Sequence, residues 1–471
     1  MTIKLAKLLA MIDVPCQDER IVAGISDDSR QIEKDWLFLA RKGTQDNGEQ
    51  YVNEALAKGA VVLWEQKPCP NCYQCRDITA AQAVILRAFY HDPCRHLHVI
   101  GVTGTNGKTS ISNLLAQMLA ALGKKTMVIG TGHIRYEDHD IPIDNTTPSA
   151  CTLAYYFHAA QETGCFGVIM EVSSHAIDQK RIGFIRFDEI IYTNIASDHL
   201  DYHITRTHYQ YTKLKLRNYL KRTGIIIVNH DDSSLHPLYQ FHDRKIVTIG
   251  QGQAHLQLSK CEVRATGSTF CLQQEAYTIP LLGFHNIVNT AQCLVVLQRL
   301  HVSLAQRQQI TSRLHSVSGR MECHEWCDRY IVIDYAHTAS SLQTLLHTVD
   351  EMKEKRMLVI CGCGGDRDRT KRSKMAEIAV TYGDIVIFTS DNPRNEYPAD
   401  ILKDMTVQIK GDYEVFENRF YAIKYAVKIA QEHDIIVIAG KGDEVFQYMN
   451  DKKYPFSDRE CVRQVLKDVK L

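Results

Sequence analysis

The sequence predicts an α/β protein of three domains, each built on a mostly parallel sheet. Three observations support this fold class. The chain has 471 residues, which at roughly 150 residues per domain suggests about three domains. Strand-like and helix-like patterns alternate along the chain, as they do in parallel α/β sheets. Several short apolar runs are followed at once by Gly-rich or polar strings, the pattern of strands that end at a ligand-binding edge.

The expected domain boundaries follow from breaks in this pattern. The first domain covers residues 1–95 and closes with the turn-like His91-Asp92-Pro93. The second covers 96–317, with a β-like stretch near 250–281 and a helix from Asn286. Its strand candidates are 98–102, 126–129, 166–172, 189–195 and 224–229. The third domain covers 318–471, where a doubly wound, Rossmann-like sheet is expected.

Composition and charge narrow the class of protein. Lys plus Arg number 55 and Asp plus Glu also number 55, so the formal net charge is zero. Such a balance gives no reason to expect a nucleic-acid or anionic-membrane binder. The N-terminus lacks a signal-peptide pattern, and no apolar string approaches the roughly 20 residues that span a bilayer. We therefore expect a cytoplasmic monomer with reduced thiols that neither inserts into membranes nor binds nucleic acid.

Four apolar runs of the third domain, 330–334, 356–360, 384–388 and 434–439, each precede a string of polar or glycine residues. These strings are 335–338, 362–367, 391–394 and 440–444. Because the carboxyl ends of parallel strands meet at one edge, the four strings should converge there. Ordinary loop composition explains one or two of them, but not the recurrence of Arg and Asp in successive loops. A ligand site is the better interpretation.

The central domain opens with a phosphate-binding pattern. Gly104-Thr105-Asn106-Gly107-Lys108-Thr109 follows a strand and begins a helix. That helix carries one apolar stripe, formed by Ile111, Leu114, Leu115, Met118, Leu119 and Leu122, with Gly123 as its C-cap. Lys108 would reach the β- and γ-phosphates and Thr109 would ligate Mg²⁺. Val102 occupies a position where the strict P-loop pattern has Gly, so the match is near rather than complete. We expect a P-loop ATPase-like parallel sheet.

Acidic and imidazole groups at neighbouring strand ends predict a metal position beside this loop. Glu171 ends an apolar strand, and His199 lies in the 198–203 string after another. Carboxylate and imidazole groups next to a triphosphate are suited to Mg²⁺. Either residue alone would be better explained as a capping or buried hydrogen-bonded group, and only their shared position favours a metal.

Three cysteines, Cys69, Cys72 and Cys75, have CxxC spacing, with Cys94 further along the chain. Structural zinc usually has four clearly paired ligands. We therefore favour a Pro-containing surface hairpin with free thiols over a metal site.

Seven ordered motifs together resemble the Mur ligases, and most closely the MurE-type branch that adds the third peptide residue in peptidoglycan synthesis. They are 104–109, 171–175, 198–203, 319–322, 334–338, 362–372 and 391–394. Asp28-Ser29-Arg30 is similar to the family's N-terminal UDP-sugar domain, and 454–460 to its C-terminal signature. The resemblance implies ATP-dependent activation of UDP-N-acetylmuramoyl-L-Ala-D-Glu as an acyl phosphate, followed by attack of a diamino acid.

The resemblance also implies roles for particular residues. ATP would contact Gly104, Thr105, Asn106, Gly107, Lys108, Thr109, Asn286, Arg320, Asp334 and His337. The UDP-muramoyl-dipeptide would contact Ser29, Asn145, Thr146, Thr147, Ser173, Gln179 and Arg181. Mg²⁺ would be held by Thr109, Glu171, His199 and Lys213, and catalysis would rest on Lys108, Lys213, His199 and Glu171. The family carries a carbamylated lysine at the position of Lys213. A carbamate would attract a metal that an ammonium repels.

Asp391-Asn392-Pro393-Arg394 resembles the pattern of enzymes that add meso-diaminopimelate. An Arg fork can bind the distal carboxylate that lysine lacks. The implied pocket comprises Arg367, Asp391, Asn392, Pro393, Arg394, Gly440 and Glu444. Asp443 stands where the family usually has His, which leaves L-lysine or ornithine as alternative substrates. Two other readings are a folylpolyglutamate-type or different Mur ligase, and a non-catalytic nucleotide-binding relative.

Overall fold

The computed structural model describes residues 1–43, 47–196, 198–264 and 266–468. Its contacts divide the chain into two units. Unit 1 comprises Met1–Gln257 and Gln292–Leu300, and unit 2 comprises Leu258–Ala291 and His301–Leu471. The α/β class with three main sheets is confirmed, whereas the exact boundaries at 95 and 317 stay a prediction.

The N-terminal part of unit 1 contains a four-stranded parallel sheet. Its strands in order are β3 (Gly24–Ser26), β4 (Trp36–Leu39), β5 (Val61–Trp64) and β6 (Cys72–Gln74). A small antiparallel pair, β1 (Ile3–Lys4) and β2 (Ile21–Val22), accompanies it, with helices α1 (Leu5–Ala10), α2 (Val52–Ala57) and α3 (Ile78–Phe89). The Asp77 carboxylate accepts the Thr79 and Ala80 N–H groups and so caps α3.

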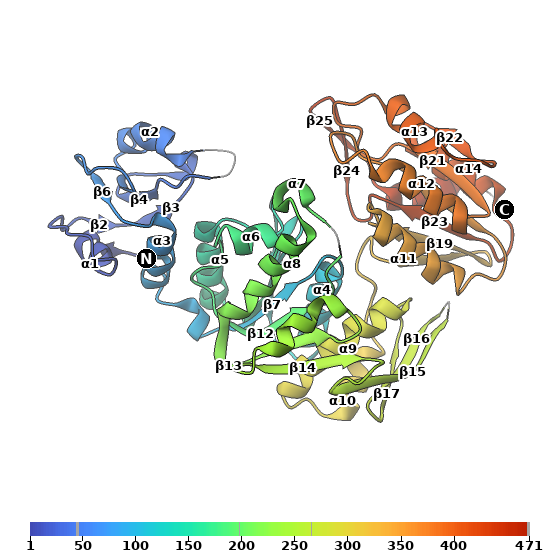
Figure 1. Ribbon diagram of the computed structural model, residues 1–471, viewed down its shortest axis with the longest axis horizontal. Coiled ribbons are helices and arrows are strands. Elements are labelled where there is room, and N and C mark those ends of the chain that lie inside the picture. The colour runs from blue at the N-terminus through green and yellow to red at the C-terminus, as the bar shows by residue number, and fades with distance from the viewer. Residues whose placement is uncertain (44–46, 197, 265, 469–471) are drawn as a thin grey trace. The chain divides into compact units, whose positions relative to one another are not determined.

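A central sheet places the phosphate loop at its middle strand. The parallel strands run in the order β8 (Thr126–Gly130), β11 (Gly167–Glu171), β7 (His98–Thr103), β12 (Phe187–Tyr192), β13 (Leu220–Asn229) and β14 (Lys245–Gly250). The antiparallel hairpin β9 (His133–Tyr136) and β10 (His139–Pro142) extends one side. On the other side are β15 (Leu256–Arg264), β16 (Gly267–Leu272) and β17 (Glu275–Ile279), all labelled in Figure 1.

The predicted strands of this sheet are confirmed with one informative shift. The strand expected over 189–195 ends at Tyr192, because the residues after it turn to hydrogen-bond the phosphate loop. The Thr193 hydroxyl donates to the Asn106 carbonyl at 2.6 Å, and Thr105 N–H donates to the Asn194 carbonyl at 2.8 Å. The expected helix α4 spans Lys108–Ala121, with Leu122 as C-cap and Gly123 at φ +69°.

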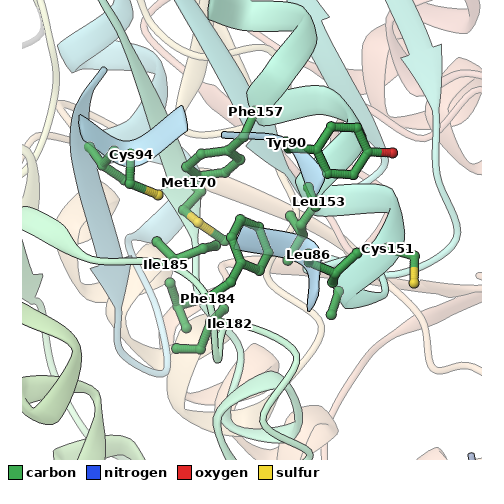
Figure 2. Packing of buried hydrophobic residues seen from close by; sticks show 14 of the residues in the cluster. Leu86, Tyr90, Cys94, Cys151, Leu153, Phe157, Met170, Ile182, Phe184 and Ile185 are labelled. Carbon is green, nitrogen blue, oxygen red and sulfur yellow. The ribbon is translucent and has the colours of Figure 1, made fainter. Parts of the chain in front are cut away.

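The remaining helices of this region are α5 (Ala150–Glu162), α6 (Ser174–Asp178), α7 (Leu200–His203), α8 (Arg206–Leu214), α9 (Phe284–Arg299) and α10 (Leu304–Thr311). The core of unit 1 is continuous from α3 through α5 to β11 and the segment after α6. Figure 2 shows Phe157 and Phe184 packed beside Met170 and Leu86. The two phenylalanine rings meet edge to face, with 5.8 Å between centroids. Apolar burial of this kind is the main stabilising force.

Unit 2 contains a doubly wound sheet of six strands. Their order is β18 (Glu322–Trp326), β19 (Arg329–Asp334), β23 (Ile435–Ala439), β20 (Met357–Cys361), β21 (Ile385–Thr389) and β22 (Glu414–Phe416). Helices α11 (Ala339–Asp350), α12 (Lys371–Tyr382) and α13 (Pro398–Thr406) pack on one face. Helices α14 (Arg419–Ile429) and α15 (Asp458–Asp468) pack on the other. The hairpin β24 (Phe446–Met449) and β25 (Lys452–Pro455) follows β23, as labelled in Figure 1.

The cysteine cluster is only partly the surface feature that the sequence predicts. Cys69 is exposed and pairs with Cys72 through two backbone hydrogen bonds. Cys72, Cys75 and Cys94 are buried, so the expectation of a surface hairpin is wrong for these three side chains, which pack among apolar neighbours. All 15 cysteines are free thiols. Among the described residues, no helix is both long enough and apolar enough to cross a bilayer.

Candidate active site

The phosphate loop connects the end of β7 to the start of α4. Gly104 has no room for a side chain, since an added Cβ would lie 1.8 Å from the Thr193 hydroxyl oxygen. Gly107 at φ +84° adopts a left-handed conformation that glycine favours. The loop therefore delivers the N-terminus of α4 to the edge of the sheet, where free N–H groups and the helix dipole favour a phosphate.

Two lysine ammonium groups meet at this loop. Lys108 Nζ donates to the carbonyls of Gly104 at 3.0 Å and Thr105 at 2.8 Å. Lys213 Nζ, from α8, donates to the same Gly104 carbonyl at 2.8 Å. Lys213 is 2% exposed. Burial, followed by repulsion from Lys108, lowers the pKa of Lys213 well below its usual value.

Glu171 lies at the end of β11 and is almost completely buried. Its carboxylate accepts the Thr131 N–H at 3.2 Å and the Thr131 hydroxyl at 3.1 Å. Gly130 makes this possible, because a Cβ there would lie 2.3 Å from Glu171 Oε1. Within the described residues no cationic side chain pairs with this carboxylate, so its charge is available to a cation.

His199 belongs to a cluster of rings from the segments that follow β11 and β12. It adopts φ +52° just before α7, and its ring centroid lies 4.9 Å from that of His175 and 6.3 Å from that of Tyr209. Tyr209 accepts or donates a hydrogen bond with the Thr105 hydroxyl at 3.1 Å, which ties the ring cluster to the phosphate loop. The side chain of Asp201, in the same motif, lies outside the described residues.

The metal-binding residues expected from the sequence do not form a complete metal site by themselves. No three His, Cys, Asp or Glu side chains of the described residues are grouped so that they could hold a metal ion alone. The predicted set, however, includes a hydroxyl, a modified lysine and nucleotide oxygens, which suit Mg²⁺ because it keeps waters and phosphates in its coordination shell. The buried, cation-free carboxylate of Glu171 fits such a site.

The predicted residues of the muramoyl-dipeptide site form a hydrogen-bonded group. The Thr147 hydroxyl donates to the Glu171 carbonyl at 2.9 Å and accepts the Ser173 N–H at 3.0 Å. Arg181 donates to the Thr147 carbonyl at 2.7 Å and to Gln179 Oε1 at 2.9 Å. Burial, then the nearby Arg41, lowers the pKa of Arg181. An anionic substrate group would relieve that repulsion.

The N-terminal loop reaches the same group. Asp27 accepts a hydrogen bond from the Ser149 hydroxyl at 2.9 Å, and Arg41 donates to the Gln179 carbonyl at 3.3 Å. The predicted Ser29 donates its hydroxyl to Glu54 at 3.1 Å. Thr146 shares a hydrogen bond with Thr131 at 3.2 Å, whereas Asn145 is exposed.

The other predicted nucleotide residues lie in unit 2. Asp334 ends β19, and its carboxylate accepts the N–H groups of Met321 at 2.7 Å and Ala336 at 2.8 Å. The Arg320 guanidinium lies 4.2 Å from the Tyr335 ring centroid. His337 follows, and Lys371 donates to its carbonyl at 2.9 Å. Asn286 is buried and donates to the Leu282 carbonyl at 2.8 Å, so its amide also has a structural role at the start of α9.

Two arginines from the loops after β20 and β21 lie beside the same glycine, Gly364. Arg394 donates to the Gly365 carbonyl at 2.8 Å. A Cβ on Gly364 would lie 2.8 Å from Arg394 Nη1 and 3.8 Å from Arg367 Cγ. Burial, then Arg367, lowers the pKa of Arg394. The Pro393 carbonyl lies so close to Gly365 that a Cβ there would be 1.9 Å from the carbonyl oxygen. Two neighbouring cations are suited to a carboxylate.

An acidic side of this pocket lies at the ends of β21 and β23. The Asp391 Oδ2 atom is buried without a hydrogen-bond partner among the described residues. Gly440, at φ +123°, approaches it so closely that a Cβ would lie 2.5 Å from Oδ2. Asn392 donates to Glu444 Oε2 at 2.8 Å. The loops after β20, β21 and β23 thus present cationic and anionic groups together, as a zwitterionic amino acid requires.

Sequence reasoning missed several residues that hold these groups. Asp27 and Arg41 carry no motif that relates them to residues more than a hundred positions away. Tyr202 donates to Asp178 at 2.9 Å and accepts from Gln179 at 3.3 Å. The position of Tyr202 within the 198–203 motif was the one sequence feature that could have identified it as a site residue. Lys441 lies in the 440–444 string that the sequence singles out, but its burial was not foreseeable from that string.

Comparisons with known proteins agree with the motifs. A family model described as the Mur ligase middle domain matches residues 102–297, and one described as the Mur ligase glutamate ligase domain matches 319–442. The chain is 36% identical over 454 residues to the UDP-N-acetylmuramoyl-L-alanyl-D-glutamate–2,6-diaminopimelate ligase of Halalkalibacterium halodurans, covering 94% of this chain and 93% of that protein. It is 35% identical to the enzyme of the same name from Geobacillus kaustophilus, with 95% of each covered.

Solved structures show the same relationship. A UDP-N-acetylmuramoyl-L-alanyl-D-glutamate–2,6-diaminopimelate ligase aligns with a TM-score of 0.73 and 31% identity, over 99% of both chains. Folylpolyglutamate synthase from Mycobacterium tuberculosis aligns with a TM-score of 0.63 and 17% identity, over 77% of this chain and 92% of its own. The second similarity extends to the fold alone.

Proposed function

The chain belongs to the Mur ligase family, and on this premise we propose that it joins meso-diaminopimelate to UDP-N-acetylmuramoyl-L-Ala-D-Glu in peptidoglycan synthesis. The observation that carries the choice of amino acid is the arginine pair beside Gly364, where an added Cβ would lie 2.8 Å from Arg394 Nη1 and 3.8 Å from Arg367 Cγ. The named relatives at about one third identity add diaminopimelate. This agreement between pocket and relatives supports the proposal.

The reaction proceeds by transfer of the γ-phosphoryl group of ATP to the terminal carboxylate of the dipeptide. The resulting acyl phosphate is attacked by the amine of the incoming amino acid, an amide bond forms, and phosphate leaves with loss of a proton from nitrogen. Such phosphoryl transfer depends on positioning and charge neutralisation. Lys108 and the N–H groups that begin α4 supply both for the phosphates, and Arg181 supplies charge on the dipeptide side.

Mg²⁺ would be held by Glu171, His199 and Thr109 together with a carbamate on Lys213. When bound, the ion supplies positive charge that the phosphate oxygens need. The low pKa of Lys213 supports the modification, since a neutral amine can add to CO₂ with loss of one proton. The carbamate product would replace the repulsion between Lys213 and Lys108 with attraction.

Arg394 and Arg367 would bind the distal carboxylate of meso-diaminopimelate, and Glu444 would bind an ammonium group. Lysine has no distal carboxylate, so it would leave the half-buried Arg394 guanidinium without that partner. Asn286, Arg320, Asp334 and His337 would contact the nucleotide. The UDP-muramoyl-dipeptide would be bound by Ser29, Asn145, Thr146, Thr147, Ser173 and Gln179.

The proposal extends to the setting of the enzyme. The substrates are phosphorylated or charged molecules of the cell interior, so we place the protein in the cytoplasm, acting as a monomer of three domains with boundaries near residues 95 and 317. No membrane or nucleic-acid partner is required by the reaction.

The test is an ADP-release assay with purified protein, ATP, Mg²⁺ and the UDP-muramoyl-dipeptide. Diaminopimelate, L-lysine and ornithine are supplied in turn. We expect ADP release only when both dipeptide and diaminopimelate are present. Equal turnover with lysine would remove the assignment of the amino acid. Release with a folylpolyglutamate acceptor instead of the dipeptide would replace the proposal with that rival, and no release with any acceptor would indicate a non-catalytic nucleotide-binding protein.

A further inference from the structure

A fully buried lysine, Lys441, lies beneath the proposed amino-acid pocket. It lies two residues after the end of β23 and is 0% exposed. Its ammonium donates to Glu444 Oε2 at 2.7 Å, to the Phe446 carbonyl at 2.8 Å and to Asn392 Oδ1 at 3.1 Å. An ammonium has three hydrogens, and all three are used here. A buried charge is tolerated only when it is paired and fully hydrogen-bonded, and Lys441 meets that condition.

The three acceptors of Lys441 connect separate parts of the pocket. Asn392 belongs to the loop after β21, Glu444 to the loop after β23, and Phe446 begins β24. Asn392 Nδ2 also donates to Glu444 Oε2 at 2.8 Å. The side chains of Lys441, Asn392 and Glu444 are therefore all hydrogen-bonded to one another. Glu444 therefore presents Oε2 to the protein, and within the described residues no hydrogen bond reaches its Oε1.

The same contacts hold the loop that carries Arg394. Tyr448 N–H donates to Asn392 Oδ1 at 3.0 Å, and the Arg394 N–H donates to the Tyr448 carbonyl at 2.9 Å. Arg394 has φ +52°, a conformation that a non-glycine residue adopts only when its surroundings hold it there. The side-chain oxygen of Asn392 thus accepts hydrogen bonds from both the Lys441 ammonium and the β24 backbone. Both bonds hold the loop that carries Arg394.

From this geometry we propose that Lys441 is a positioning residue for the incoming amino acid, fixing Glu444 and Asn392 so that Glu444 Oε1 and the Arg394 guanidinium face the ligand at a set separation. The inference rests on the proposed function, because it takes this pocket to be the amino-acid site. Lys441 does not touch the ligand in this account. Its loss would free Glu444 and the Arg394 loop together, which would weaken binding of an amino acid that must satisfy both ends at once.

The experiment measures KM for diaminopimelate, ATP and the UDP-muramoyl-dipeptide in Lys441→Gln and Lys441→Met. We expect KM for diaminopimelate to rise roughly 10- to 100-fold, the range for losing a hydrogen bond to a charged group. KM for the other two substrates should change by less than about twofold, because the two side chains that accept from Lys441 are assigned to the amino acid, whereas a general distortion of the active enzyme would alter all three constants. Lys452→Met is the matched control, an exposed lysine on the neighbouring strand β25, and should leave all constants unchanged.

A second arm keeps the test decisive if the Lys441 variants fold poorly. Lys441→Arg retains the charge and should recover part of the diaminopimelate KM. Combining Lys441→Gln with Glu444→Gln should raise KM by less than the product of the single effects, since both act through one contact. The inference would be overturned if the effects of the two substitutions on KM simply multiplied, or if KM rose equally for all three substrates. Failure of the unmutated enzyme to use diaminopimelate would instead reject the proposed function, so the two failures are distinct.

Discussion

The Nζ atoms of Lys108 and Lys213 donate to one carbonyl oxygen, that of Gly104, at 3.0 and 2.8 Å. Two ammonium groups sharing one acceptor repel each other, and the repulsion is strong when one of them is buried. The arrangement becomes favourable if the buried amine is neutral or carries a negative carbamate. This is the physical basis for proposing a carbamate on Lys213 rather than on Lys108, which contacts the phosphate loop at the more open position.

Replacing Lys213 with Ala should lower kcat by about 100-fold or more, because a group that neutralises developing charge is lost. The unmutated protein should also incorporate one CO₂ per chain from labelled bicarbonate, detected as a carbamate carbon by NMR. Lys215 provides the control. It lies two residues away with its Nζ 4.8 Å from the Tyr211 ring centroid, and Lys215→Ala should retain both activity and label. Full activity of Lys213→Ala would reject the assignment.

Substitution of Arg394 by Ala should raise KM for diaminopimelate by roughly 30-fold or more, while KM for ATP stays within about twofold. The reason is that the guanidinium pairs with a carboxylate that only the amino acid brings. Steady-state kinetics with each substrate varied in turn provides the measurement. Arg313→Ala, at an exposed position after α10, is the matched control. A rise in both constants would mean that Arg394 supports the fold of unit 2 rather than binding the amino acid.

Much of this architecture was predictable from the sequence, since runs rich in Val and Ile form the buried strands and a Gly-rich string before a striped helix forms the phosphate loop. These signals are local. The contacts of Asp27 and Arg41 with the cap residues of α5 and α6, Ser149 and Gln179, were not predictable, because they depend on how the chain packs over long separations. The same holds for Lys441. Its neighbours in the 440–444 string suggest an exposed loop, and only the tertiary fold shows that three acceptors surround its ammonium.

Two glycines with nearly the same φ angle allow the close approach at Asp391 to be tested. Gly440 has φ +123° and Gly411 has φ +124°, so alanine is strained at either position by about 1–2 kcal/mol. Only at Gly440 would the new Cβ also meet an atom, Asp391 Oδ2 at 2.5 Å, since no atom lies within 4 Å at Gly411.

We therefore expect Gly440→Ala to lower the melting temperature more than Gly411→Ala and to raise KM for diaminopimelate, which Gly411→Ala should leave unchanged. Thermal unfolding and steady-state kinetics on the two variants provide the comparison. Equal effects on both measurements would show that backbone strain alone accounts for the requirement for glycine, and that the contact with Asp391 has no separate importance.

We expect acid to destabilise unit 2 through protonation of the Glu322 carboxylate. Burial acts to raise its pKa, but hydrogen bonds from His324 and from Arg459 of α15 overcome this and lower the pKa to about 2. The folded-state pKa is therefore below the ordinary value of 4.5. A group of this kind stabilises the fold fully above its unfolded pKa, and that contribution is lost as pH falls from about 4.5 to about 2.

Accordingly, Glu322→Gln should lower the melting temperature at pH 7, and the difference from the unmutated protein should shrink as the pH falls through this window. The control is Glu262→Gln. Glu262 forms an ion pair with Arg264 at 2.7 Å, but both side chains are largely exposed, and such pairs contribute little. Its loss should leave the melting temperature nearly unchanged at every pH. A constant difference for Glu322→Gln between pH 7 and pH 3 would show that packing, rather than the charge of Glu322, joins α15 to β18.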